Sequence, residues 1–524
     1  MTTTDDDKPA RDPLEALRFI LHNPPRRAAL DHIIDIIHQT WLTEPSLATD
    51  TLVPYAQEHL RRWYQSSPMG WEPNWSHPDS VAFQRWHFAD PLCLDARRCP
   101  QALDALRWWL DFPAHHPPPP WVRLLRSLDT QRLSLRPDNL PHLLATGALD
   151  SLGALWLDYQ TTTDDLCHAL SSPQAPPALR HLSLWGENIG PALLMDLFEA
   201  PWTQTLTSLQ LGDCHTLPFG ALSDLLDRLP ALQSLSLRSC TGIHNALDAI
   251  RHSKAAPRLR HLDLDGAEMD DLILEWLAEG DLLPSLELLD LSNNPLTEVS
   301  MRALAQSRAL SHLKALNVRH HLDSNPVQHL LESPIDHKLD ALFLGPRSVD
   351  GQMLRDMAHD PRFEALKWFG CHEELWSGDM LEAMGDLLDR AKPQCVVFND
   401  RQWHLHDPDG GDPGAQMAIK GLIQRPWWHH IEHLVTWGLD PEPHQAHQNM
   451  HTALKASPKR LVRLEILAHP GPFDVKLDTI NPSPSLQHLG LCWDAEEEPP
   501  KGLQTPPKSW QNCTIETDWR QIYR

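Results

Sequence analysis

The chain has 524 residues, with 45 Lys and Arg against 70 Asp and Glu, which gives a formal net charge of −25. This charge opposes docking on phosphate backbones and anionic lipid, so it argues against nucleic-acid and membrane-surface binding. No apolar run approaches the roughly 18 residues of a transmembrane helix. The start is acidic and polar, and the nine cysteines include no C-x-x-C pair. We therefore expect a cytoplasmic protein with reduced thiols.

The N-terminal part lacks any long repeat. Residues 1–12 are polar and are expected to be disordered. From residue 13 the apolar positions keep helical spacing, as in Leu30, Ile33 and Ile37. Four prolines at 117–120 cannot continue a helix. We predict a helical, Trp-rich domain over residues 13–125 that caps the open end of the segment after it.

From Leu152 to Leu366 the pattern L-x-x-L-x-L recurs with starts 26 or 27 residues apart. Its L-x-L core alternates as a strand requires. In the second half of each repeat the apolar residues have helical spacing, as in Leu222, Leu225, Leu226 and Leu229, or in Met269, Leu272, Ile273 and Trp276. One strand and one helix per repeat predict an α/β solenoid over residues 126–394, a horseshoe with a concave parallel sheet and convex helices.

The repeat resembles the leucine-rich-repeat superfamily, especially its long-repeat class typified by ribonuclease inhibitor, over roughly residues 128–495. The superfamily consensus asks for Asn or Cys three residues after the last strand leucine. Cys214, Cys240 and Asn294 meet it, whereas Ala267 and Arg347 do not. The resemblance therefore implies a polar ladder along the turns that is interrupted.

The 27-residue phase fails after Pro393. We predict an irregular insertion over residues 395–430 and degenerate repeats over residues 431–495. A C-terminal cap or tail follows over residues 496–524. Insertions into repeat arrays often form binding loops.

Two features of the insertion could suggest a metal. Asp407 and Asp409 begin an acidic glycine loop, but Gly411 and Ala418 stand where an EF-hand needs an Asx and a Glu. The histidines between 404 and 433 are dense, yet they show no metal-ligand spacing. We predict no metal and no cofactor, and the sequence leaves open whether this His-rich region binds metal.

Catalytic motifs are nearly absent. Cys492-Trp493-Asp494 resembles the C-x-D core of bacterial leucine-rich-repeat ubiquitin ligases, in which the thiolate accepts ubiquitin. In that family the motif lies in a separate helical domain, whereas here it follows repeat leucines, so packing is the preferred interpretation. The chain has no G-x-S-x-G, P-loop or G-x-G-x-x-G motif, and we predict no catalytic residue.

The side chains that flank the strand leucines should face the concave side. We predict that the following residues form a binding face there: Trp156, Asp158, His181, Trp185, Arg238, His261, Asp263, Asp265, Asp290, Arg319, Phe343 and Trp368. Trp156 and Trp185 fall on adjacent strands and would form one aromatic patch. The three aspartates would form an acidic stripe beside Arg238. The alternative for the aromatic residues is that they pack on one another.

These patterns favour a non-catalytic protein–protein interaction scaffold whose concave face binds a protein partner, expected to be basic because the stripe is acidic. The alternatives are a ubiquitin-ligase-like or other effector enzyme, or a GTPase-activating regulator. The sequence does not identify the partner or the oligomeric state.

Overall fold

The computed structural model describes residues 12–22, 29–66, 100–111, 117–130, 140–157, 164–186, 189–215, 219–278, 283–319, 326–345, 349–371, 377–399, 424–438, 460–461, 463–468, 482, 485–486, 488–493 and 513–516. These residues divide into two compact units. The first comprises the described residues up to Leu235 together with Cys240–Ala255. The second comprises Ser236–Ser239 and the described residues from Ala256 onward.

The first unit begins with helices. They are α1 (Pro13–His22), α2 (Ala29–Thr43), α3 (Pro45–Leu47), the π-helix η2 (Ala48–Leu52), α4 (Val53–Ser66), α5 (Pro100–Asp111) and the 3₁₀ helix η4 (Pro120–Leu124). Proline begins several of them, at the position where a helix does not need the missing N–H. Leu30, Ile33 and Ile37 of α2 are fully buried, which confirms the apolar stripe predicted there. None of the described helices is long and apolar enough to span a membrane.

Strands and helices then alternate through the rest of the first unit. They are β1 (Ser127–Asp129), α6 (Leu140–Ala145), β2 (Ala154–Leu157), α7 (Asp164–Ser171), β3 (His181–Trp185), α8 (Pro191–Asp196), η6 (Leu197–Glu199), η7 (Pro201–Gln204), β4 (Ser208–Gly212), α9 (Phe219–Arg228), β5 (Ser234–Ser236) and α10 (Ile243–His252). Strand β5 crosses the division between the units. The parallel register aligns Leu155, Leu182 and Leu209, so equivalent leucines stack from repeat to repeat.

The second unit continues the alternation. It contains η8 (Ala256–Arg258), β6 (His261–Asp263), α11 (Asp271–Ala278), β7 (Leu288–Asp290), α12 (Glu298–Gln306), η9 (Arg308–Ser311), β8 (Ala315–Val318), α13 (Pro326–Glu332), β9 (Ala341–Leu344), α14 (Gly351–His359), η10 (Pro361–Phe363), β10 (Trp368–Cys371), α15 (Gly378–Ala391), β11 (Cys395–Asn399), η11 (Pro426–His429), β12 (His433–Gly438), β13 (Arg463–Ala468), β14 (His488–Trp493) and β15 (Thr514–Glu516). Strands β6 to β15 pair in chain order. Strand β15 lies within the segment predicted only as a cap or tail.

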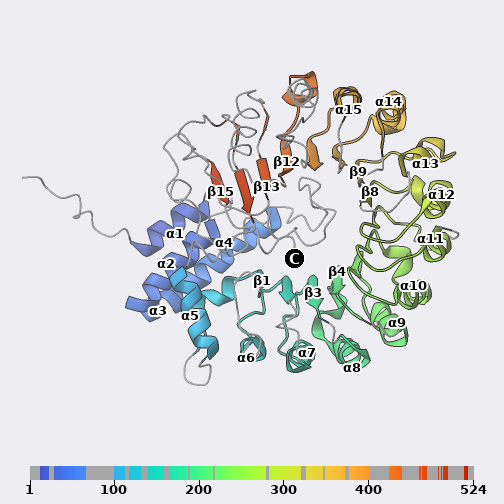
Figure 1. The fold of residues 1–524 in the computed structure, drawn as a ribbon. Helices are drawn as coiled ribbons and strands as arrows, with labels where there is room; N and C mark the ends of the chain where they lie inside the picture. Colours follow the sequence, from blue (N-terminus) through green and yellow to red (C-terminus); the bar gives the residue numbers. More distant parts are fainter. Residues whose placement is uncertain are drawn as a thin grey trace, which may run out of the picture. The chain divides into compact units, whose positions relative to one another are not determined.

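Within each unit the helices of the repeats lie on one side of the parallel strands (Figure 1). The fold is an α/β solenoid, as the repeat pattern predicts. The core between strands and helices consists mainly of leucines, and Leu222, Leu225, Leu226 and Leu229 of the predicted helical stripe are all fully buried.

One predicted helical stripe is wrong. Helix α11 begins at Asp271, after Met269, so counting the helical period from Met269 selects the wrong side. Leu272 is 73% exposed, and Leu274 and Leu277 are the residues that α11 buries. The turn before the helix takes Met269 into the core independently of the helical phase.

The turns after the strands carry the interrupted ladder. Asn294 is buried, and its Nδ2 donates to Leu264 O at 2.8 Å while its Oδ1 accepts from Met269 N at 2.9 Å. Earlier in the chain a cysteine side chain bonds to turn backbone in the same way. Cys240 Sγ accepts a hydrogen bond from Cys214 N at 3.4 Å and donates one to Leu211 O at 3.1 Å. These cysteines therefore satisfy turn backbone rather than present a reactive thiol.

Candidate binding face of the sheet

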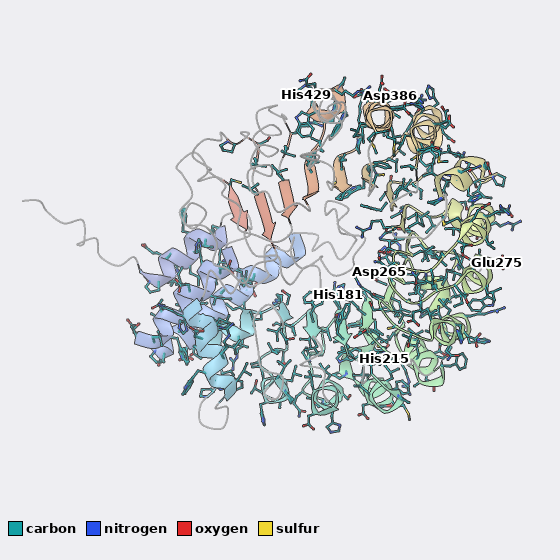
Figure 2. All side chains as sticks on the ribbon, viewed as in Figure 1. His181, His215, Asp265, Glu275, Asp386 and His429 are labelled. Atoms are coloured by element: carbon teal, nitrogen blue, oxygen red, sulfur yellow. The ribbon has the colours of Figure 1, made fainter. Side chains whose placement is uncertain are left out.

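The open face is the side of the strands opposite the helices. Successive side chains of a strand alternate between the two sides, so every second residue faces this side. In the second unit we define two rows by their register. The middle row is Ser236, Asp263, Asp290, Asn317, Phe343 and Gly370, and the outer row is Arg238, Asp265, Ser292 and Arg319. Figure 2 shows Asp265 on the strand side and Glu275 on helix α11 at the other side.

The middle row contains two hydrogen-bonded side-chain pairs on neighbouring strands. Ser236 Oγ donates to Asp263 Oδ2 at 2.9 Å, and Asn317 Nδ2 donates to Asp290 Oδ2 at 2.9 Å. Between these bonds, Asp263 and Asp290 are direct register partners on β6 and β7. The exposed fractions of the two aspartates are only 0% and 2%. They are therefore not part of an exposed acidic stripe, because their short side chains are covered by their neighbours.

Burial changes the acidity of this pair. The pKa of Asp263 is held well above its ordinary value by desolvation and then by the nearby charges of Asp290 and Asp265. Desolvation, together with the charge of Asp265, raises the pKa of Asp290 to about 6, although hydrogen bonds from Ser292 oppose the shift. A buried carboxyl beside another carboxyl keeps its proton, since two adjacent charges cannot both be stabilised there. The middle row thus carries less negative charge than the sequence suggests.

The outer row pairs its charges internally. Arg238 lies 2.9 Å from Asp265 Oδ2, and Asn293 Nδ2 donates to Asp265 Oδ1 at 2.6 Å. Both carboxylate oxygens of Asp265 are therefore occupied, and its exposed fraction is 5%. The Arg238 side chain retains 25% exposure. The charge accessible at this position is thus the guanidinium rather than the carboxylate.

Arg319 is the second half-buried cation of the outer row. Its Nε donates to Asn317 Oδ1 at 3.2 Å, and its Cζ lies 5.9 Å from the centroid of the Phe343 ring. These two contacts hold the stem of the side chain. Among the described residues no hydrogen bond reaches its two terminal nitrogens. The guanidinium is therefore held in position by Asn317 and Phe343.

Large aromatic side chains on this face pack on glycines of the next strand. A Cβ atom added to Gly370 would lie 2.3 Å from Phe343 Cδ1, and one added to Gly212 would lie 2.5 Å from Trp185 Cδ2. The Trp185 indole is also held by a hydrogen bond from Nε1 to Ser183 Oγ at 3.0 Å. At these two sites the aromatic side chains therefore pack closely on glycine.

The remaining predicted residues differ in accessibility. Trp156 on β2 is half-buried and is the register partner of Ser183. Trp368 is buried. His181 and His261 are buried as well, and desolvation lowers the pKa of His181 well below its ordinary value and that of His261 to about 4. Both imidazoles are therefore neutral near pH 7.

Several predicted features lie outside the described residues. They are Asp158, the acidic glycine loop from Asp407, His404 with His406, and Asp494. Cys492 lies in β14, opposite Leu467 of β13, but its side chain is outside the described part. Within that part no group of three or more His, Cys, Asp or Glu side chains is arranged to hold a metal ion.

A row of alternating charges, which was not predicted from the sequence, lies just before the strands of the second unit. Glu287 lies between Arg260, at 2.7 Å, and Lys314, at 3.1 Å, and Lys367 lies 3.1 Å from Asp340. Hydrogen bonds from Arg260 and Lys314 hold the pKa of Glu287 below its ordinary value, although desolvation opposes them. The signal was present in the sequence, because these residues recur at the repeat period with alternating sign.

Comparisons with known proteins identify no family for the chain. No family model and no curated protein matches the chain. Among solved structures, it is similar to a chain in the crystal structure of the Rad7 and Elc1 complex in yeast. That match has 16% sequence identity and a TM-score of 0.39, and it covers 67% of this chain and 86% of the other.

Proposed function

We propose that this protein is a non-catalytic scaffold of the leucine-rich-repeat, long-repeat class, and that a protein partner binds its open face. The observation that carries the proposal is the guanidinium of Arg319, held by Asn317 and Phe343, whose terminal nitrogens make no hydrogen bond within the described part of the chain. Arginine anchors of this kind are common at the centres of protein interfaces. A side chain ordered before binding loses less entropy when a partner arrives.

The middle row supports the same proposal by holding the face rigid. Its hydrogen bonds join Ser236 to Asp263 and Asn317 to Asp290, so neighbouring strands are connected by side chains as well as by backbone. A surface that is preordered over several strands loses less entropy when a partner binds. We propose no catalytic step for it.

The proposal makes one statement about the overall charge of the partner and another about the groups that contact the face. The net charge of −25 would attract a basic partner over long range. The aspartates of the middle and outer rows are not its docking point, because they are buried and internally bonded. Locally, Arg238 and Arg319 would meet acceptor groups of the partner, such as carboxylates or backbone carbonyls.

The proposal is tested by affinity purification from the source cells followed by mass spectrometry. The wild-type chain is compared with Arg319→Ala and with Leu272→Ala, which alters an exposed apolar residue on the helix side. We expect one protein to be enriched by the wild type and by Leu272→Ala, and to be lost with Arg319→Ala while its circular dichroism is unchanged. Equal enrichment by all three proteins would contradict the proposed face.

A further inference from the structure

Two histidines from different helices lie beside each other in the N-terminal helical part. His22 ends α1 and His59 lies in α4, and their ring centroids are 5.7 Å apart with the ring planes at 46°. One turn earlier on the same helices, Arg18 Cζ lies 5.9 Å from the centroid of the Tyr55 ring. The two helices therefore meet through matched i and i+4 pairs, which places both imidazoles at one helix–helix contact.

The local hydrogen bonds fix the same tautomer in both rings. His22 Nδ1 lies 2.8 Å from Arg18 O, and His59 Nδ1 lies 2.9 Å from Tyr55 O. A carbonyl oxygen only accepts, so Nδ1 is the nitrogen that carries the proton in each neutral ring. The lone pair is then left on Nε2 of both rings. Histidines that bind metals are oriented in this way, with one ring nitrogen donating to a carbonyl and the other facing the ion.

The separation of the rings fits one shared ion. Metal–nitrogen distances of about 2.0–2.1 Å and a tetrahedral angle place the centroids of two coordinating imidazoles about 5 Å apart. The observed 5.7 Å is close enough that small side-chain rotations would close the difference. His22 is exposed and His59 is half-buried, so an ion can reach the pair from solvent.

We propose that His22 and His59 form a two-ligand site for a late first-row divalent cation of the class of Zn²⁺, Ni²⁺ or Cu²⁺. Imidazole suits these ions, and affinity rises toward Cu²⁺. The other coordination positions are taken by water or by a group of a binding partner. Because the protein supplies two ligands, the ion is exchangeable, in contrast to a closed four-ligand structural site. Its effect on the fold is to join α1 to α4.

The test uses the untagged full-length chain and the metal ion alone. Isothermal titration with Zn²⁺ is performed on the wild type, on His22→Ala, on His59→Ala and on His252→Ala. His252 is a matched control, because its Nδ1 makes the same bond to Asp248 O, at 2.8 Å, while its ring neighbour is Phe219 instead of a second histidine. We expect His22→Ala and His59→Ala each to weaken one site by about 100-fold, since chelation is lost. His252→Ala should leave that site within about twofold.

A second readout counts the ligands directly. Pulsed electron paramagnetic resonance of substoichiometric Cu²⁺ should show a two-imidazole centre in the wild type that His22→Ala converts to one imidazole. His22→Gln, which keeps a side-chain donor for Arg18 O, replaces His22→Ala if the alanine variant loses helical circular dichroism. Unchanged Zn²⁺ affinity and an unchanged Cu²⁺ spectrum in the His22 and His59 variants would overturn the proposal. Loss of affinity in His252→Ala equal to that in His22→Ala would overturn it as well.

Discussion

Asp263 and Asp290 are direct register partners on strands β6 and β7, and both carboxyl groups are buried. Each accepts hydrogen bonds from neighbours, Ser236 on one side and Asn317 on the other. Desolvation raises both pKa values, and nearby carboxylates add to it: Asp290 and Asp265 act on Asp263, and Asp265 acts on Asp290. The pair therefore retains a proton at a pH where an exposed aspartate has lost it.

This relationship predicts that stability falls as pH rises. The unfolded chain releases these protons near its ordinary aspartate pKa, whereas folded Asp290 releases its proton at about 6 and folded Asp263 above its ordinary value. The contribution of these two protonated carboxyl groups to the free energy of unfolding is complete below the pKa of the unfolded chain. It is lost as pH rises through the pKa values of the folded protein. We expect Asp290→Asn to reduce the decline between about pH 5 and about pH 8 by about 1–3 kcal/mol, measured by urea unfolding.

Asp271 supplies the control for that experiment. Desolvation acts to raise its pKa, but hydrogen bonds from Ser300 and Thr297 outweigh this effect and lower it. Its contribution is therefore lost only as pH falls, and Asp271→Asn should keep the wild-type decline between about pH 5 and about pH 8. A wild-type decline that persists unchanged in Asp290→Asn would refute the assignment to the buried pair.

Glycine packing under the aromatic residues predicts opposite effects for the same substitution at two sites. Gly212→Ala should destabilise the protein by about 1–3 kcal/mol, because the new Cβ would overlap the Trp185 indole. Gly220→Ala in α9 meets no atom within 4 Å and should be neutral or stabilising, since alanine favours helix. Thermal unfolding of the two variants compares them directly. Destabilisation by Gly220→Ala equal to that by Gly212→Ala would contradict the packing account.

The alternating charge row predicts an effect of salt. Glu287→Lys would place three cations in succession with Arg260 and Lys314, in place of two ion pairs. We expect a loss of about 1–2 kcal/mol at low ionic strength, and about half of it should be recovered near 1 M NaCl, where screening is strong. Arg302→Glu on α12 alters a single exposed i, i+4 pair with Glu298 and should cost less. A loss for Glu287→Lys that salt does not change would point to packing instead.

The turn cysteines are predicted to be unreactive in the folded protein. Cys214 and Cys240 are fully buried, and the interaction with the Cys240 side chain, together with desolvation, raises the pKa of Cys214 above its ordinary value. Iodoacetamide labelling followed by peptide mass spectrometry should leave both unmodified under native conditions and modify both in guanidinium chloride. Native labelling of Cys240 at the rate of the unfolded chain would show that it does not hold the turn.

Much of the fold was predictable because the leucine period specifies it at every repeat. The stacked leucines Leu155, Leu182 and Leu209 and the stripe of α9 follow from spacing alone. The buried residues of α11 could not be predicted from spacing, because Met269, a turn residue, enters the core before the helix begins. Spacing gives the period of a helix, and the first residue of the helix decides its phase.

The candidate face was predictable in position but not in accessibility. The pattern places Asp263, Asp290 and Arg319 on the open side, and the structure finds them there. Their exposure differs: Asp263 and Asp290 are buried among their neighbours, whereas the side chain of Arg238 keeps 25% exposure. The spacing of the leucines assigns a side of the sheet but not the fraction of each side chain that remains exposed.

The central claim is that the open face binds a protein partner through its fixed arginines. Once the partner is identified by affinity purification, its Kd is measured by isothermal titration for the wild type, for Arg319→Glu and for Arg302→Glu on the helix side. The account predicts that Arg319→Glu weakens binding by at least about 30-fold, the scale of an interface anchor, while Arg302→Glu stays within about twofold. Equal Kd values for the wild type and Arg319→Glu, or a larger loss for Arg302→Glu, would contradict it.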